Sequence, residues 1–576
     1  MKTPQSILSS YWGYSQFRPQ QLAVIESVLA KKDTLTLLPT GAGKSICFQV
    51  PPLCNNSICI IISPLIALMQ DQVKDLQSKN IKAISLGAHL NAEEQTQILA
   101  DIKSGQYQFI YCSPEKLAQT SFQQFLQTIS IGLFAIDEAH CISQWGYDFR
   151  PSYRKLGMLK KLFPQTPILA MTASAIPLVQ ADIIQQLQLK EANVLQDSFL
   201  RPRLKYQVQK VPVKLHTLRM LLMEDKDPIQ SKGSSIIYCT TRNSVDQLTQ
   251  ILMSYGFSVA AYHAGLPLQE RQYVQQQWMQ NKIQIMVCTN AFGMGINKPD
   301  VRKVIHYDLP NSLEQYYQEA GRAGRDGNDA TALLLYQQND WDYWEQLQTK
   351  KYPPIDIIKQ IYQDLADFVQ LPIGMGEKQQ FLFDFENFCL VFKWDKIVAR
   401  NALQWIAQEG HVQFSDSQFK PSMIQVIANR QSIEQFEQQH IIPGKVLQTL
   451  LRSYGGILDS PQYIHEGQLG TLLQRDIEFV KKQLIQLTEF GLISYEQKGD
   501  QPIVEFKWNR TSAAFMKLDF DNYTARKKAF LDRIDCFTTY IQGRELTCRS
   551  SYLASYFGEK APIPCGICDL CTSTKD

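Results

Sequence analysis

The stretch TLTLLPTGAGKS, residues 34–45, decides how the N-terminal half of the chain is interpreted. An apolar run with the length of a buried strand leads into a glycine-containing turn, and a segment of helical period follows. Backbone N–H groups in such a turn can wrap phosphates at the helix N-terminus, where the dipole favours anions. The residues of this turn are Thr40, Gly41, Ala42 and Gly43. Lys44 can then reach the β- and γ-phosphates of a nucleotide, and the Ser45 hydroxyl can bind Mg²⁺. The full phosphate-loop pattern has glycine where this chain has Leu38, and a chance GlyLysSer is the alternative.

The same alternation of apolar run, turn and helical segment continues to about residue 345. The runs are 34–38, 58–62, 109–112 and 133–136, and then, after the pattern restarts near residue 205, 235–239, 259–262, 285–288 and 304–307. Short buried strands that alternate with helices are typical of parallel α/β sheets. The sequence therefore predicts an α/β fold with two tandem doubly wound parallel-sheet domains, residues 1–203 and 204–345, joined by a linker at 201–206.

Composition limits the class of protein. The chain has 576 residues, of which 44% are hydrophobic and 20% charged, which excludes a disordered or collagen-like chain. Its net charge of +3 is small, so any grip on nucleic acid must come from local basic patches. Thirteen cysteines are far too few for a disulfide scaffold and indicate a reducing, cytoplasmic location. We expect no secretory signal and no membrane span, because the longest apolar stretch, 57–69, is short and broken.

Two adjacent carboxylates follow the apolar run at 133–136. Asp137 at the end of a buried strand can hold Mg²⁺, and Glu138 can polarise an attacking water. On their own, two such acids could also cap a helix N-terminus. Combined with the phosphate-binding turn, they indicate nucleoside triphosphate hydrolysis.

A third element lies in the second α/β domain, in the stretch QEAGRAGRDG at 318–327. Arg322 and Arg325 are three residues apart, so on a helix both can face one phosphate. Guanidinium groups that enter from another domain stabilise charge on the transferred phosphoryl group. An arginine-rich surface helix is the alternative.

Together, these motifs resemble the superfamily 2 helicases. The longer strings DEAHCISQWGYDFRP (137–151), AFGMGINKPD (291–300) and GRAGRDG (321–327) resemble RecQ-type DNA helicases in particular. The resemblance covers about residues 10–345 and resumes at the C-terminus. It implies two RecA-like domains, ATP and Mg²⁺ as cofactors, and 3′→5′ translocation on single-stranded DNA with unwinding of forked duplexes in repair and recombination. It also places Gln318 with the arginines in the catalytic set.

The resemblance assigns further roles. Gln21 would bind the adenine edge, with Tyr14 and Arg18 on the faces of the base. Ser63 and Pro64 in the first domain would track the DNA strand. Thr289 and Asn290 would grip its backbone from the second domain.

The motif MTASA (171–175) would link hydrolysis to DNA. Here Ser174 replaces the family's more common threonine and keeps the hydroxyl.

The segment after the acidic pair is rich in aromatic residues: Trp145, Tyr147, Phe149 and Tyr153. Aromatic rings stack on bases without regard to sequence, so a loop here could sense DNA beside the metal-binding acids. Arg150 lies among them and is a further candidate for a DNA contact. A core role for these rings is the alternative.

Residues 346–520 are rich in glutamine and aromatic side chains and are predominantly helical. A helix over 477–487 that ends near Gly491, followed by strand-like runs at 492–495 and 503–506, predicts a winged helix with Lys498 at the wing tip as a phosphate contact. A weaker copy is predicted at 394–414. The alternative is a helical bundle with a surface hairpin.

Four cysteines gather near the C-terminus: Cys548, Cys565, Cys568 and Cys571. Four thiolates suit one structural Zn²⁺, although the CysXXCysXXCys run also fits part of an iron–sulfur motif. The resemblance favours zinc and makes residues 521–576 a helical zinc-binding module, with basic residues at 526–528 and Arg533 beside it. In most family members this module directly follows the second α/β domain and precedes the winged helix. Here about 180 residues intervene, and no accessory helical domain is expected after it.

The function predicted from these observations is an ATP-dependent DNA helicase whose inserted segment touches duplex DNA near a fork. Two alternatives stay open. One is an ATPase that translocates and remodels protein–DNA complexes without unwinding, and the other is a DNA-binding scaffold with a degenerate ATP site. RNA is disfavoured as a substrate by the resemblance. Single-strand-binding or recombination proteins are candidate partners, and we expect a monomer.

Overall fold

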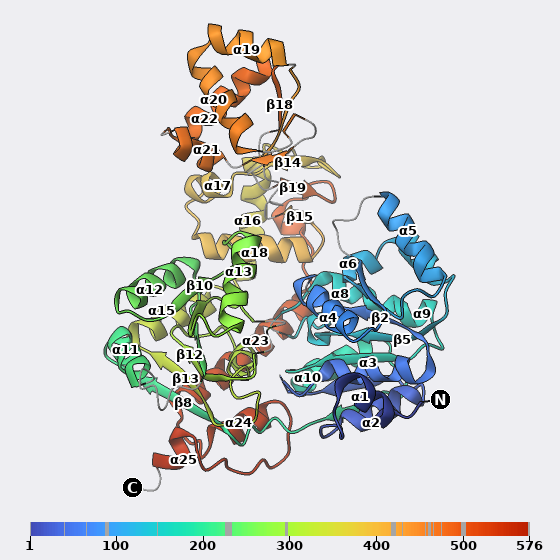
Figure 1. The fold of residues 1–576 in the computed structure, drawn as a ribbon. Coiled ribbons are helices and arrows are strands. Elements are labelled where there is room, and N and C mark those ends of the chain that lie inside the picture. The colour runs from blue at the N-terminus through green and yellow to red at the C-terminus, as the bar shows by residue number, and fades with distance from the viewer. Residues whose placement is uncertain are drawn as a thin grey trace. The chain divides into compact units, whose positions relative to one another are not determined.

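The computed structural model describes residues 2–39, 41–64, 66–86, 92–146, 148–224, 233–293, 296, 298–415, 422–428, 430–454, 457–458, 462–464, 466–473, 475–496 and 503–573. The chain forms two compact units, one of Met1–Glu345 with Thr524–Asp576 and the other of Gln346–Tyr523 (Figure 1). Among the described helices, none is long and apolar enough to cross a membrane.

The first lobe of the larger unit is built on a seven-stranded sheet with the order β3-β4-β2-β5-β6-β1-β7, in which every pair is parallel. Its strands are β1 (Thr34–Leu37), β2 (Ile58–Ile62), β3 (Ala83–Leu86), β4 (Phe109–Cys112), β5 (Ile131–Ile136), β6 (Ile168–Thr172) and β7 (Asn193–Gln196). Its helices are α1 (Pro4–Trp12), α2 (Gln21–Leu29), α3 (Lys44–Asn55), α4 (Ile66–Ser78), α5 (Ala92–Lys103), α6 (Pro114–Leu117), α7 (Thr120–Leu126), α8 (Pro151–Arg154), α9 (Met158–Leu162) and α10 (Pro177–Gln186), with short 3₁₀ turns at Ala139–Ile142 and Lys155–Gly157. Strand β1, which lies between β6 and β7, is buried at every residue, as expected where helices cover both faces.

The second lobe has a six-stranded parallel sheet with the order β10-β11-β9-β12-β13-β8. Its strands are β8 (Leu204–Lys210), β9 (Ser234–Tyr238), β10 (Val259–Tyr262), β11 (Ile285–Cys288), β12 (Val301–His306) and β13 (Ala330–Tyr336). Its helices are α11 (Lys214–Glu224), α12 (Arg242–Ser254), α13 (Leu268–Met279), α14 (Leu313–Ala320) and α15 (Gln338–Thr349). The interpretation of 201–206 as linker was wrong in its second half, because β8 begins at Leu204 and pairs with β13 along its whole length.

The C-terminal segment that carries the four clustered cysteines lies on the second lobe although it is last in the chain. It consists of α23 (Phe520–Gln542), α24 (Arg549–Tyr556) and α25 (Asp569–Ser573). Asp569 Oδ2 accepts a hydrogen bond from the Val208 N–H of β8 at 3.1 Å, and the Tyr540 hydroxyl lies 3.2 Å from that of Tyr316 on α14. Residues 346–523 are therefore an insertion between a lobe and the module that packs on it.

The inserted unit begins with a winged helix. It comprises α16 (Ile355–Phe368), β14 (Gln380–Leu382), α17 (Phe385–Val391), α18 (Lys396–Gln408), β15 (Val412–Ser415) and β19 (Ile503–Phe506), followed by a 3₁₀ turn at Ala513–Phe515. Its antiparallel sheet has the order β14-β19-β15, so the last strand lies in the middle. The weaker winged-helix pattern that the sequence predicts at 394–414 lies in this domain.

A second winged helix is inserted between β15 and β19 of the first. It comprises β16 (Ser422–Val426), α19 (Arg430–Gln439), α20 (Ile441–Ser453), β17 (Gln462–Ile464), α21 (Glu466–Leu473), α22 (Ile477–Glu489) and β18 (Ile493–Glu496). Its sheet has the order β17-β16-β18, so the first strand of the segment takes the central place that β19 takes in the first winged helix. The second domain is thus a permuted version of the first.

The predicted hairpin between 492–495 and 503–506 was wrong. β18 pairs with β16, and β19 pairs with β14 and β15, so the two runs belong to different sheets. Their apolar side chains divide accordingly, since Ile493 is buried in the core of the second winged helix and Val504 in that of the first. Lys498, the predicted wing-tip contact, lies outside the described residues.

The nested insertion predicts that the second winged helix can be excised. Ser415 and Ile503 are register partners, so replacing residues 416–502 by Asn-Gly would close the β15–β19 hairpin with a two-residue turn. A shorter connection costs less closure entropy, so calorimetry should give the remaining chain a melting temperature no lower than that of the full chain. If calorimetry showed no cooperative unfolding of the first winged helix in this variant, that domain would depend on the second for its fold.

Candidate functional site

A cavity of about 880 Å³ lies between the two lobes of the larger unit. It is lined by nearly all of the residues that the sequence predicts for a nucleotide site: Tyr14, Arg18, Gln21, Gly41, Gly43, Lys44, Ser45, Asp137 and Glu138 from the first lobe, and Gln318, Arg322 and Arg325 from the second. Thr40 lies outside the described residues. The phosphate-binding turn and the acidic pair lie together because they follow the carboxyl ends of the parallel strands β1 and β5, where open α/β sheets bind ligands. Tyr14, Arg18 and Gln21 instead come from the segment that precedes β1.

The phosphate-binding turn has a backbone that requires glycine at two positions. Gly41 and Gly43 have φ angles of 86° and 77°, in the left-handed region. A Cβ at Gly43 would lie 2.6 Å from Gln21 Nε2, and one at Gly41 would lie 3.1 Å from the Arg325 side chain. Lys44 begins α3, and its Nζ donates to the Leu38 carbonyl at 3.3 Å. The turn is therefore a close-packed cradle in contact with both lobes.

Gln21 braces this turn. Its Nε2 donates to the carbonyls of Ala42 and Gly43, at 3.0 Å each, and its Oε1 accepts from the Arg18 N–H at 2.9 Å. Arg18 Nη1 also donates to the Gly41 carbonyl. Tyr14 is 58% exposed at the cavity edge. An adenine contact for Gln21, Tyr14 and Arg18 stays a prediction, because in this structure the Gln21 amide already bonds the turn.

The acidic pair lies at the end of β5 with its carboxylates buried. Burial, and then repulsion from Glu138, raises the pKa of Asp137, while the Lys44 ammonium opposes the shift. Burial likewise raises the pKa of Glu138, which Lys44 and Arg322 lower. Glu138 has a φ of 48°, and a non-glycine residue in the left-handed region is a form of strain that gathers at functional sites. A cation bound here would relieve the repulsion between the two carboxylates, so the donor set fits Mg²⁺.

Three polar side chains of the second lobe line the cavity, and one of them, Gln318, bonds the first lobe. Gln318 Nε2 donates to Ser174 Oγ at 2.7 Å, so the serine that replaces threonine in this motif uses its hydroxyl between the lobes. Arg322 donates to the Gly293 carbonyl and Arg325 to the Ile296 carbonyl. Burial, with Arg322 and then Arg201 nearby, lowers the pKa of Arg325 to about 9. A buried pair of guanidinium groups beside a phosphate-binding turn is suited to an anion.

Two contributors to this site were missed from the sequence. Arg201 donates to the carbonyls of Gly321, Ala323 and Gly324, at 2.9 to 3.2 Å, and so holds the turn that carries the arginines. Asp71, on α4, lines the cavity. A lone arginine in a linker and a polar helix residue give no sequence signal of such roles.

The residues of the first lobe that are predicted to contact DNA differ in how far they are exposed. Trp145, Phe149 and Arg150 are half-buried. Arg150 pairs with Asp148 at 3.2 Å and donates to the Pro64 carbonyl at 3.4 Å, so the aromatic loop and the 63–64 loop lie together. Ser63 is buried.

Tyr153 is part of the core. It has no exposed surface, and its hydroxyl donates to the Asp137 carbonyl at 3.0 Å. The expectation that its ring belongs to the stacking loop was therefore wrong. Tyr147 lies outside the described residues.

In the second lobe, Asn290 is exposed and Thr289 is buried. Two histidines of this lobe are structural: His263 pairs with Asp246 at 3.0 Å and His306 with Glu319 at 2.9 Å. Of the two residues that are predicted to contact the DNA backbone, Asn290 is thus the accessible one.

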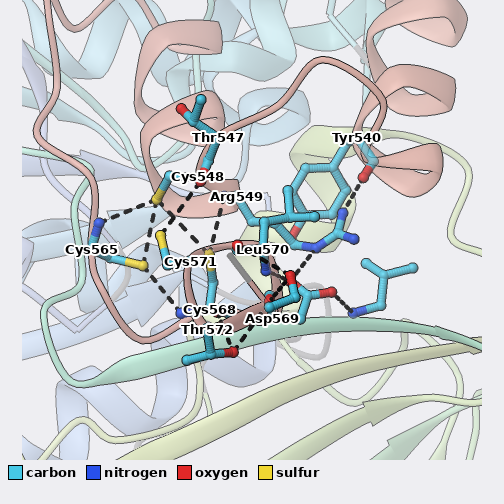
Figure 2. Close-up of polar contacts among 12 residues, drawn as sticks. Tyr540, Thr547, Cys548, Arg549, Cys565, Cys568, Asp569, Leu570, Cys571 and Thr572 are labelled. Carbon is cyan, nitrogen blue, oxygen red and sulfur yellow. Dashed lines mark hydrogen bonds and ion pairs between the residues drawn. The ribbon is translucent and has the colours of Figure 1, made fainter. Parts of the chain in front are cut away.

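The four cysteines form one cluster (Figure 2). Their Sγ atoms all lie within 4.8 Å of one another. Burial raises the pKa of the Cys548 thiol, but hydrogen bonds from Ser551 and the Cys565 N–H bring it below its usual value. The pKa values of Cys565 and Cys571 are raised, by burial and by neighbouring sulfurs. Four thiols so close cannot all ionise without a cation between them, and four sulfur donors fit a structural Zn²⁺.

Each lobe, the second winged helix and the cysteine module match the description of a known protein family. The matching descriptions are DEAD/DEAH box helicase over residues 18–181, helicase conserved C-terminal domain over 213–327, RecQ helicase winged-helix domain of Bacteroidota over 424–497, and RecQ zinc-binding over 510–572. The fold and site are thus those of a tandem RecA-like helicase core with a four-cysteine module. The zinc-binding match decides between zinc and an iron–sulfur cluster at the cysteines.

Curated relatives narrow the assignment. The chain is 44% identical over 349 residues to the ATP-dependent DNA helicase RecQ of Haemophilus influenzae, covering 61% of this chain and 56% of that protein. It is 39% identical over 345 residues to the probable ATP-dependent DNA helicase RecS of Bacillus subtilis, covering 60% of this chain and 68% of that protein. The chain belongs to the RecQ family of ATP-dependent DNA helicases.

Two further comparisons set the extent of this likeness. The chain spans 56% and 55% of the RecQ helicases of H. influenzae and Pasteurella multocida. Among solved structures, Mss116p bound to single-stranded RNA and AMP-PNP has a TM-score of 0.51 at 14% identity, covering 80% of this chain and 94% of that one. Likeness at that identity shows the fold alone.

The cysteine cluster predicts about one zinc per chain. Cys568→Ser should remove most of the metal and lower the melting temperature, because the site orders the module that packs on β8. Plasma emission spectroscopy and calorimetry measure both effects. Cys536→Ser, which changes a half-buried cysteine outside the cluster, is the control and should keep the zinc. Equal zinc content in the two variants would contradict the site.

Proposed function

We propose that this chain is an ATP-dependent DNA helicase that translocates 3′→5′ on single-stranded DNA and unwinds forked duplexes in repair and recombination. The observation that carries the proposal is the shared cavity, which brings the phosphate-binding turn and acidic pair of one lobe to the arginines of the other. Membership of the RecQ family supports the polarity and the choice of DNA over RNA. A cytoplasmic monomer is consistent with cysteines that form no disulfide among the described residues and with a site that one chain completes.

The residues of the cavity have distinct roles in ATP hydrolysis. The N–H groups of the 40–45 turn and the Lys44 ammonium hold the phosphates, and Gln21 and Arg18 keep the turn in shape. Glu138 accepts a proton from the attacking water, and burial raises the pKa of its carboxyl, which makes the carboxylate a stronger base. Mg²⁺, held by Ser45 and Asp137, would neutralise phosphate charge when bound.

Arg322 and Arg325 supply positive charge to the γ-phosphoryl group from the second lobe. Because they belong to a different lobe from Lys44, full stabilisation needs the lobes to close. Hydrolysis and phosphate release then remove the anion that holds them together. Repeated closing and opening, with Trp145, Phe149, Arg150, Ser63 and Pro64 on one lobe and Thr289 and Asn290 on the other, would ratchet the two lobes along a strand.

We assign the duplex contact of the inserted unit to the first winged helix. The exposed stripe of α18 is basic and polar and consists of Lys396, Arg400, Gln404 and Gln408. The corresponding stripe of α22 in the second winged helix consists of Glu478, Lys482, Ile485 and Glu489. The basic stripe of α18 attracts DNA phosphates, whereas the net negative charge of the α22 stripe repels them. Lys396 is paired with Glu386, but both side chains are more than half exposed, so this pair costs little to separate.

The ATP site predicts two inactive variants. Lys44→Ala loses the ammonium that holds the phosphates, and Glu138→Gln loses the base, so each should reduce DNA-stimulated ATP hydrolysis by about 100-fold or more in a coupled-enzyme assay. Lys103→Ala, at an exposed lysine in the last turn of α5, is the matched control and should behave as the unchanged protein. Undiminished turnover in either variant would remove that residue from the mechanism.

The α18 stripe predicts a selective loss of duplex affinity. Combined Lys396→Ala and Arg400→Ala should weaken duplex binding and reduce the slope of log affinity against log salt by about two. Fluorescence anisotropy over a salt series measures both. The matched pair on α22, Lys481→Ala and Lys482→Ala, should have little effect. The assignment is wrong if the α22 pair weakens binding and the α18 pair does not.

A further inference from the structure

The helix α23 carries three side chains on one face that connect the zinc-binding module to both lobes. They are Arg533, Phe537 and Tyr540, spaced by four and three residues. Phe537 packs edge-to-face on Trp344 with ring centroids 5.4 Å apart, and the Tyr540 hydroxyl lies 3.2 Å from that of Tyr316. Both partners belong to the second lobe. This end of α23 is therefore fixed to the second lobe by buried aromatic contacts.

Arg533, at the other end of the stripe, contacts the first lobe. Its Nη1 donates to the backbone carbonyl of Trp145 at 2.6 Å. On its own lobe this loop is held through Ser143, whose Oγ accepts from the Trp145 N–H at 3.2 Å and donates to Asp182 at 2.6 Å. The loop that follows the acidic pair is thus held from both lobes.

The cysteine cluster is joined to α23 through Arg549. Arg549 follows Cys548 in the chain, donates through Nη1 to the Tyr540 carbonyl, and pairs through Nε with Asp569 at 2.6 Å. Asp569 follows Cys568 and bonds β8. A physical connection therefore runs from the cysteines through Arg549 and α23 to Arg533 and the Trp145 loop (Figure 2 shows its first part).

We propose that Arg533 is a positioning residue for the aromatic loop, an inference that rests on the proposed function. Arg533 bonds the backbone of Trp145 and so does not occupy its half-buried indole ring. Because α23 is fixed to the second lobe, closure of the lobes over ATP moves Arg533 relative to the first lobe and shifts the loop with it. The zinc-binding module thereby couples lobe closure to the presentation of Trp145 and Phe149 to single-stranded DNA.

The first test uses the DNA-free protein, in which a direct contact of Arg533 with DNA has no effect. In Arg533→Ala, hydrogen exchange at amides of residues 143–150 should become roughly tenfold faster, which corresponds to about 1.4 kcal/mol. Arg533→Lys keeps a donor and should restore part of the protection. Arg544→Ala, at an exposed arginine of the same module, is the matched control and should leave exchange unchanged. Unchanged exchange in Arg533→Ala would overturn the proposal.

The second test measures the coupling itself. The single-stranded DNA concentration for half-maximal ATPase stimulation should rise roughly tenfold in Arg533→Ala, with zinc content and melting temperature kept. A variant that loses zinc or unfolds at lower temperature would show a structural role and overturn the positioning role. The two proposals fail differently: if the unchanged protein shows no stimulation by DNA, the proposed function is wrong, whereas normal stimulation in Arg533→Ala overturns only the role of Arg533.

Discussion

The contact on which the account depends is the meeting of the phosphate-binding turn with the arginine turn of the other lobe. A Cβ at Gly41 would lie 3.1 Å from the Arg325 side chain, closer than ordinary van der Waals contact, and Gln318 bonds Ser174 across the same junction. The two lobes share no strand, so within the described residues they meet through side chains rather than a common sheet. Such a junction can open and close, and an anion bound in it changes the balance between the two states.

The rest of the chain is arranged so that this junction is kept despite a large insertion. The zinc-binding module completes the second lobe, although residues 346–523 separate the two in the chain. Within that insertion, the second winged helix is placed between two strands of the first that lie side by side. Insertions are tolerated where the chain ends they separate are neighbours in space, and both insertions meet this condition.

Much of the catalytic core could be predicted from sequence because its signals are local. Three features can be identified from a few neighbouring residues each: the strand that precedes Lys44, the acids after β5 and the cysteines near the C-terminus. The failures came from long-range pairing. The runs at 492–495 and 503–506 look like a hairpin because they are close in sequence, yet their partners lie about 70 and 90 residues upstream. Tyr153 was grouped with its aromatic neighbours because sequence does not show which ring faces the core. Arg533 was noted only as a basic residue beside the cysteines, because a bond to a distant backbone carbonyl leaves no sequence signal.

The central claim is that ATP bound between the two lobes drives movement along a DNA strand, and steady-state ATP hydrolysis with and without single-stranded DNA tests it most directly. The account predicts a low rate for the protein alone and a steep, saturable rise as the strand is added, since DNA held by both lobes favours the closed site. An ATPase rate that is the same with and without DNA, at saturating nucleotide, would contradict it.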